Sequence, residues 1–188
     1  MTISELICEI LAQYSKVFGV GIPKTKLLKL AYLVEVKYKR RYMKRLTEAK
    51  WVYYLYGPYL WDYDEILQCK DININYREYK NNKDKEIEII SLQDCYHNEN
   101  ISSEYKFFIN SIIRDYGNMD LVDLLDYVYF ETEPMINAEN RREDLNFDCI
   151  LPEDYYYVKE IKLDPKIEKN IRRELRNKAE AFRGKRST

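Results

Sequence analysis

Residues 24–67 read KTKLLKLAYLVEVKYKRRYMKRLTEAKWVYYLYGPYLWDYDEIL, and this stretch decides the fold. Its first half predicts a long helix that begins near Pro23. Residues 48–56 are rich in aromatic and β-branched side chains, which is typical of a short strand. Tyr56-Gly57-Pro58 then predicts a corner, and residues 60–68 predict a short helix. We interpret the stretch as a fold nucleus without chemistry of its own.

The long helix has two different sides. Apolar residues at helical spacing predict the buried side: Leu27, Leu30, Ala31, Val34 and Tyr38. Basic residues fall on roughly the opposite side: Lys26, Lys29, Lys37, Arg40 and Lys44. Such a stripe is either a solvated face or a surface for an acidic protein or a nucleic acid. Both interpretations stay open at the level of sequence.

The remaining pattern predicts an α+β fold, mainly helical and compact, with a small antiparallel sheet. Helices are expected at residues 2–18, with a Thr2/Glu5 capping box and a stop at Gly19 and Gly21, then after a cap at Ser102 or Ser103, and again after Asp120. Alternating residues predict a hairpin at 71–92. We expect the sheet to be made by residues 50–56, 71–78 and 86–92.

The chain divides, on this reading, into a domain at residues 1–140 and an extension at 141–188. The extension ends in a predicted helix over 164–184 with a narrow apolar stripe on a basic background. We expect this helix to pack on the domain. Pairing with a partner or lying on a membrane surface are the other possibilities.

Charge is unevenly distributed although the net charge is only -1. Residues 24–50 hold ten Lys or Arg against two acidic residues, whereas residues 51–163 hold eleven against twenty-four. The four cysteines are scattered, and the sequence shows no signal peptide and no apolar run of membrane-spanning length. We therefore expect a cytoplasmic protein with reduced thiols and no membrane association.

A search for reactive motifs finds none of the common kinds. Phosphate-binding glycine loops, a nucleophile elbow and zinc-protease motifs are absent from the sequence. The single histidine, His97, lies in a polar stretch close to Cys95, which is typical of solvated loop residues. We expect no catalytic residue, no metal and no cofactor, and therefore not an enzyme.

The order of motifs in residues 24–67 resembles the Panacea or SocA-like antitoxin family. The resemblance rests on these residues, with support from Leu121 to Pro134: Lys26, Leu27, Leu28, Lys29, Leu30, Tyr32, Trp51, Tyr56, Gly57 and Pro58. It covers about residues 3–140. Two features depart from the family pattern: Pro134-Met135-Ile136 replaces a tryptophan, and residues 141–188 extend past the matching part.

The resemblance implies a compact, mainly helical domain that neutralises a toxin encoded beside it by direct binding, in some members with recruitment of a protease. We assign Lys29, Lys37, Arg40 and Lys44 to partner binding, with exposed tyrosines as contact area. The motif residues Leu27, Leu30, Tyr32, Trp51, Tyr56, Gly57 and Pro58 are assigned to architecture. The alternative is a nucleic-acid-binding regulator that uses the basic helix 24–45 or 164–184; an enzyme with a cryptic site is a third hypothesis. The identity of the toxin and the oligomeric state stay open.

Overall fold

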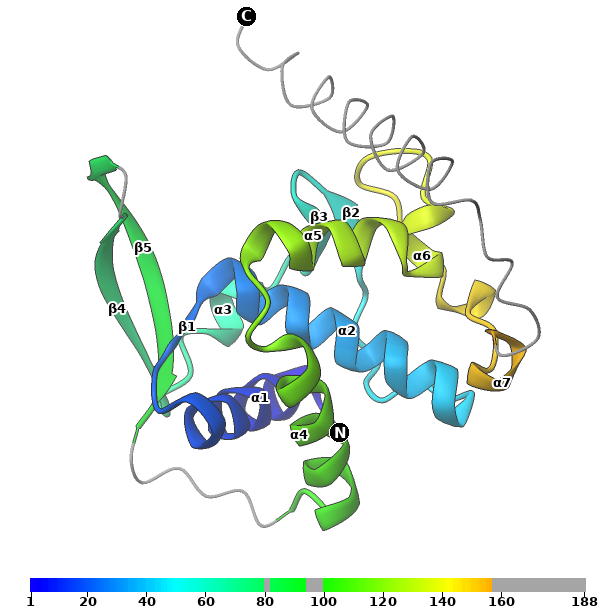
Figure 1. Cartoon of the computed structure of the whole chain (residues 1–188), viewed down its shortest axis with the longest axis horizontal. Coiled ribbons are helices and arrows are strands. Elements are labelled where there is room, and N and C mark those ends of the chain that lie inside the picture. Colours follow the sequence, from blue (N-terminus) through cyan, green and yellow to red (C-terminus); the bar gives the residue numbers. More distant parts are fainter. Residues whose placement is uncertain (80–81, 94–99, 157–188) are drawn as a thin grey trace, which may run out of the picture. The chain divides into compact units, whose positions relative to one another are not determined.

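The computed structural model describes residues 1–79, 82–93 and 100–156 (Figure 1). The chain divides into two compact units, Met1–Pro152 and Glu153–Thr188. The first unit holds these elements in order: α1 (Ile3–Phe18), β1 (Ile22–Pro23), α2 (Lys24–Tyr42), β2 (Val52–Tyr54), β3 (Gly57–Tyr59), α3 (Tyr63–Ile66), β4 (Ile72–Tyr79), β5 (Asn82–Leu92), α4 (Ser103–Tyr116), α5 (Leu121–Phe130), α6 (Glu133–Ile136) and a short 3-10 helix (Phe147–Cys149). The described part of the second unit is α7 (Glu153–Tyr156). The predicted helix 164–184 lies outside the described residues, as do Cys95 and His97.

Local capping signals set the helix boundaries as the sequence predicts. Thr2 and Glu5 form a complete capping box at the start of α1, which ends at Gly19 in the left-handed conformation (φ 68°). Ser102 accepts a hydrogen bond from the backbone N–H of Tyr105 at the start of α4. Asp120 does the same for the N–H of Asp123 in α5. These predictions are confirmed because each depends only on residues three positions apart.

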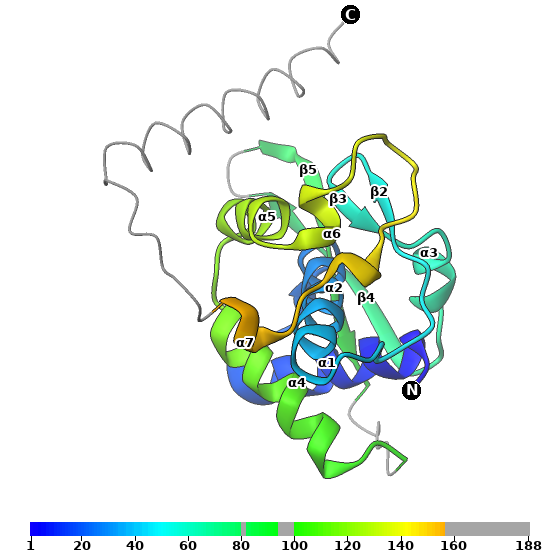
Figure 2. The ribbon, with the colours of Figure 1, turned by 90° about the vertical axis from the view of Figure 1, so that its right-hand side faces the viewer.

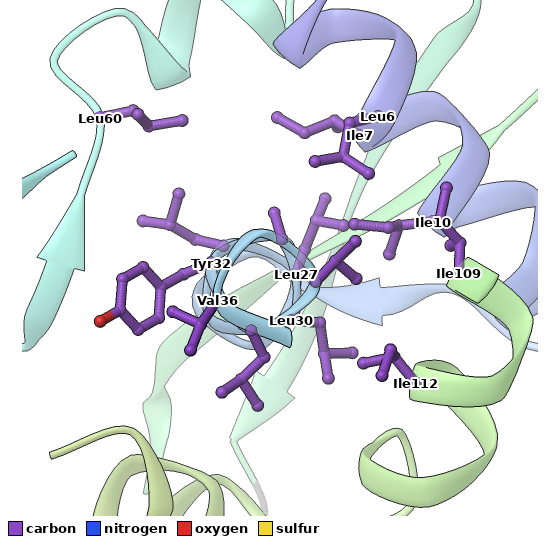
Figure 3. Close-up of a cluster of buried hydrophobic side chains, with 14 of the residues drawn as sticks. Leu6, Ile7, Ile10, Leu27, Leu30, Tyr32, Val36, Leu60, Ile109 and Ile112 are labelled. Carbon is purple, nitrogen blue, oxygen red and sulfur yellow. The ribbon is translucent and has the colours of Figure 1, made fainter. Parts of the chain in front are cut away.

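Helix α2 is the centre of the first unit (Figures 1 and 2). α1, α4, α5, β3 and β5 all pack against it. Every residue from Lys26 to Val36 is buried, so the helix has no exposed side over that length. Figure 3 shows Leu27 and Leu30 directed toward Ile10 and Ile112, while Tyr32 lies on another side of the same helix. The prediction of a solvated basic face is therefore wrong for Lys26 and Lys29.

The fold class is confirmed as α+β, mainly helical with a small antiparallel sheet, but the predicted strand set is partly wrong. The three-stranded sheet has the order β1-β5-β4, and its hairpin pairs Ile74 with Ile90. Its third strand is β1, where Ile22 pairs with Ile90. Residues 52–54 pair instead with 57–59 in a separate two-stranded sheet. A two-residue connection reverses the chain at once, so β2 meets its own successor and not the larger sheet.

The first unit extends past the predicted boundary at residue 140. The N–H of Tyr53 donates to the carbonyl of Glu143 (2.9 Å), and the N–H of Leu145 donates to the carbonyl of Trp51 (2.8 Å). The segment also contributes buried core residues: Leu145, Phe147 and Ile150. Residues 141–152 are therefore part of the first unit, which ends at Pro152.

In the described part of the chain, no helix combines the length and the apolar character that crossing a membrane requires.

Candidate protein-binding surface

The β2–β3 hairpin and the residue Trp61 after it present a group of large apolar side chains, four of them aromatic, of which three are exposed and two half-buried. We call this the aromatic surface and define it by five residues: Tyr54, Leu55, Tyr56, Tyr59 and Trp61. The exposed fraction is 60% for Tyr56 and 56% for Trp61, and 38% for Leu55. Large exposed apolar side chains that lie together, and not singly, mark a surface for a partner. The aromatic surface is therefore the candidate functional site.

The rings of the aromatic surface hold one another in place. The ring centroids of Tyr54 and Trp61 are 5.0 Å apart, those of Tyr54 and Tyr59 are 5.4 Å apart, and those of Tyr59 and Trp61 are 5.7 Å apart. Both pairs that include Trp61 meet edge to face, the arrangement that the ring quadrupoles favour. The three rings form one ordered cluster beside the turn residues Leu55 and Tyr56.

A glycine fixes the turn that presents these rings. Gly57 has φ 93°, a backbone conformation that residues with a Cβ rarely adopt. It pairs with Tyr54 across the hairpin, so Leu55 and Tyr56 form the two-residue turn. The ring of Tyr129 from α5 lies behind Gly57, 3.5 Å from where a Cβ would stand. The positive φ explains why the motif has glycine at this position, and the ring of Tyr129 is close enough for ordinary van der Waals contact with the turn.

Lys29 anchors the hairpin from inside the protein. Its exposed fraction is 2%, and its Nζ donates a hydrogen bond of 2.7 Å to the carbonyl of Pro58. Burial lowers the pKa of Lys29 to about 7, because the charged amine has lost its hydration. The lysine in the motif of α2 and the Gly-Pro in the hairpin are therefore parts of one contact.

The other basic residues of α2 also reach inward, to the segments that follow α4 and α5. Lys26 Nζ donates to the carbonyl of Met119 (2.7 Å). Lys37 Nζ lies 5.2 Å from the ring centroids of both Tyr116 and Tyr127. Arg40 forms an ion pair with Glu133, with 2.6 Å between Nη2 and a carboxylate oxygen. We call Lys26, Lys29, Lys37 and Arg40 the tethering residues, because each joins α2 to another element.

Electrostatic surroundings differ among the tethering residues. Burial by itself lowers the pKa of Lys37, but hydrogen bonding to the Tyr116 and Tyr127 hydroxyls raises the pKa overall. The pKa of Lys26 is lowered by burial, which the charge of Asp120 only partly offsets. In Arg40 and Glu133 the side chains are each 11% exposed, so the pair is largely removed from water.

The structure separates the residues that the sequence assigns to partner binding. Lys29 is buried, and Lys37 and Arg40 are half-buried with partners inside the protein. Lys44 is exposed and lies after the end of α2 at Tyr42. The four residues do not form one basic surface on α2, neither for an acidic protein nor for a nucleic acid. The reason is that α5, α6 and β3 cover the side of α2 that was expected to face water.

Most residues that the sequence assigns to architecture are buried as expected: Leu27, Leu30, Tyr32, Trp51, Gly57 and Pro58. Tyr32 shows how they connect distant segments. Its hydroxyl bonds with the hydroxyl of Thr132 at 3.0 Å, and its ring meets Trp51 and Phe147 edge to face. Tyr56 differs, because it is exposed at the hairpin turn.

Sequence reasoning missed Tyr54, Leu55, Tyr59 and Trp61 as surface residues. The available signal is the density of aromatic residues within 53–61, more than one face of a short strand can bury. Among the residues that the structure describes, no three His, Cys, Asp or Glu side chains gather as metal ligands would.

Comparison with known proteins agrees with this arrangement. The family model described as "Antitoxin SocA-like, Panacea domain" matches residues 27–134, the segment that includes α2, both hairpins, α4 and α5. No curated protein and no solved structure matches the chain. The matched segment begins within α2 and ends in α6, so it contains all the tethering residues except Lys26 and all of the aromatic surface. Because this match covers more than half of the chain, the protein belongs to the Panacea-domain family of SocA-like antitoxins, and this membership supports an antitoxin-like role.

Proposed function

We propose that this chain neutralises a toxin protein by binding it directly through the aromatic surface. The observation that carries the proposal is the exposed ring of Trp61, ordered by the half-buried rings of Tyr54 and Tyr59, beside the exposed turn residue Tyr56. Tryptophan and tyrosine are the residue types that contribute most to binding energy at protein interfaces. Family membership supplies the kind of partner, a toxin.

Rigidity of the aromatic surface supports the proposal. Binding costs free energy for each side chain or loop that must be ordered in the complex. Here the hairpin is already fixed on one side by the Lys29–Pro58 hydrogen bond and on the other by Asp144, which forms a β-bridge with Val52. The rings also restrict one another through edge-to-face contacts. A partner would therefore meet a surface that is already in its bound conformation.

In this mechanism the chain acts by covering toxin surface and performs no reaction. We propose that it is not an enzyme and that it works in the cytoplasm. The scattered spacing of the four cysteines in the sequence supports a reducing compartment. Recruitment of a protease is a separate step that some family members are thought to add. It would lower the amount of toxin in the cell, whereas covering alone would leave that amount unchanged.

Growth rescue tests the proposal. Each reading frame adjacent to the gene is expressed alone to find a toxic product and is then co-expressed with this chain. We expect rescue with one neighbour, and we expect the double variant Tyr56→Ala/Trp61→Ala to lose it. Phe107→Ala is the matched control, because Phe107 is a 77% exposed aromatic residue on α4, outside the aromatic surface. Rescue that survives the double variant, or no rescue with any neighbour, would contradict the proposal.

A further inference from the structure

Strand β5 has an open edge on the side of β1. β4 pairs with β5 over almost its whole length, from Asn82 to Leu92, whereas β1 pairs only with Ile89 and Ile90. After Pro23 the chain turns into α2, so no described strand pairs with Glu86–Glu88 on that side. Backbone groups in a strand point alternately to the two sides, so part of this edge offers N–H and C=O groups to a further strand.

A groove of about 910 Å³ is lined by residues of β4 and β5, by residues around β1 and the start of α2, and by Met119, Asp120 and Leu121. In Figure 1, β1 leads from the end of α1 past β5 into α2. Its apolar lining residues include Val20, Pro23, Ile87, Ile89, Met119 and Leu121. Basic and acidic residues also line it: Lys24, Lys26, Arg77, Glu86, Glu88 and Asp120. This volume lies in the range of sites that bind small molecules or short peptide segments. The groove therefore combines apolar lining residues with a backbone edge that can form hydrogen bonds.

Three basic and three acidic residues line the groove, and at the position of Glu86 the charge favours a basic group of an occupant. Glu88 is already neutralised, because Lys24 Nζ lies 2.8 Å from its carboxylate. Glu86, the next residue on the same face, stands directly opposite Glu78 in the hairpin, and both are exposed. Like charges opposite each other destabilise a strand pair. No described side chain forms an ion pair with Glu78 or Glu86, so a cation at this point would relieve the repulsion.

Strand β1 of the protein itself lies in the geometry that we expect for an occupant of the groove. β1 is an extended segment that lies antiparallel to β5 at the end of the groove, and Lys24 directly after it reaches Glu88. We propose that the groove binds an extended segment of a partner protein, which adds to β5 as an antiparallel strand in line with β1. The segment alternates apolar residues, which contact Ile87, with Lys or Arg, which face Glu86. This is strand addition to an open sheet edge, at elements other than those of the aromatic surface.

The test uses a fluorescein-labelled eight-residue peptide of alternating valine and lysine and the full chain. Fluorescence anisotropy at physiological salt is expected to show saturable binding, and a valine–glutamate peptide is expected to bind much more weakly. Glu86→Lys should weaken the lysine peptide about five- to tenfold, because a favourable cross-strand charge pair becomes a repulsive one. Asp115→Lys is the matched control, an exposed charge reversal on α4 that should leave the affinity unchanged.

Backbone methylation separates strand addition from simple charge attraction. Two versions of the peptide are N-methylated on alternate residues, one on the valines and one on the lysines. Each version blocks the N–H groups along one of the two edges of the peptide strand. We expect one version to lose binding and the other to keep it, because only one edge of an added strand bonds to β5. Absence of saturable binding, equal effects of both methylations, or equal effects of Glu86→Lys and Asp115→Lys would each overturn the proposal. Trp61→Ala should leave peptide binding unchanged, so this test and that of toxin neutralisation can fail independently.

Discussion

The tethering residues of α2 and the aromatic surface next to them use their side chains in opposite ways. Lys26, Lys29, Lys37 and Arg40 are basic side chains, which usually face water, yet they bond within the protein. The aromatic surface carries large rings, which usually pack inside, yet two of its residues are more than half exposed. The basic side chains therefore hold the domain together, and the rings are left for a partner.

This division explains why the hydrogen bond between Lys29 and Pro58 matters to both regions. It is the point at which a tethering residue holds the hairpin that presents the rings. A change at Lys29 is expected to act on the fold, and a change at Trp61 is expected to act on binding alone. The predictions below separate these two effects, in order of decreasing size.

Lys29→Glu is expected to have the largest effect. It places a carboxylate against the carbonyl of Pro58 at a site that is 2% exposed, so two acceptors meet and a buried charge has no counterion. We expect a loss of at least about 3 to 5 kcal/mol in the free energy of unfolding, enough to unfold the domain. Urea denaturation followed by circular dichroism measures it. Lys44→Glu, the same change at an exposed residue, should alter stability by less than about 0.5 kcal/mol; equal losses would show that Lys29 is not a buried tether.

Arg40→Ala is expected to lower the free energy of unfolding by about 2 to 3 kcal/mol. This loss is smaller than that expected for an unpaired charge at a fully buried site. Arg40 bonds both the carboxylate of Glu133 and the carbonyl of Glu131, so its removal takes the ion-pair partner away from a largely buried carboxylate. The double variant Arg40→Met/Glu133→Met should recover part of the loss, because both members of the ion pair are then removed together. Thermal unfolding of the three proteins measures this. A double variant less stable than Arg40→Ala would contradict the explanation.

Trp61→Ala is expected to weaken toxin binding by about 2 kcal/mol, or roughly thirtyfold in Kd, while the free energy of unfolding changes by less than about 1 kcal/mol. The side chain is 56% exposed and packs on the neighbouring rings of Tyr54 and Tyr59. Calorimetric titration with the toxin found by growth rescue measures the affinity. Phe107→Ala should bind like the unaltered protein, and a Trp61→Ala protein that does the same would exclude the aromatic surface.

The helices and the long hairpin could be predicted from the sequence because their signals are local. Caps at Thr2, Ser102 and Asp120 act on backbone groups three residues away, and alternation along residues 72–78 reports the period of a strand. The motif order in residues 24–58 also identified the family. Each of these depends on residue identity and spacing within a short stretch.

The environment of α2 could not be predicted, because it depends on segments far away in the sequence. Lys26 finds its carbonyl at Met119, and Arg40 finds its carboxylate at Glu133. Lysines on one side of a helix predict that this side is exposed to solvent, unless segments from elsewhere in the chain pack on it and accept hydrogen bonds from the lysines. The same distance explains the missed third strand, since β1 pairs with residues 89 and 90.

The predicted effect that is smallest per step of the experiment, here one pH unit, is a pH dependence that identifies Lys29 as the tether. Its pKa is about 7 in the folded protein against 10.5 for the unfolded chain, so between these values the unfolded state binds more protons. The free energy of unfolding should therefore rise with pH, by at most about 1.4 kcal/mol per pH unit between pH 7 and pH 9. Lys26 contributes in the same direction, because its pKa is also lowered.

The comparison is therefore with Lys29→Met, which keeps the apolar stem, removes the titrating amine and leaves Lys26 in place. Urea denaturation at pH 7, 8 and 9 should show a steeper rise for the unaltered protein than for Lys29→Met. Equal slopes would mean that the amine of Lys29 stays charged in the folded protein, and that the hairpin is held by a buried ammonium and not by a neutral donor.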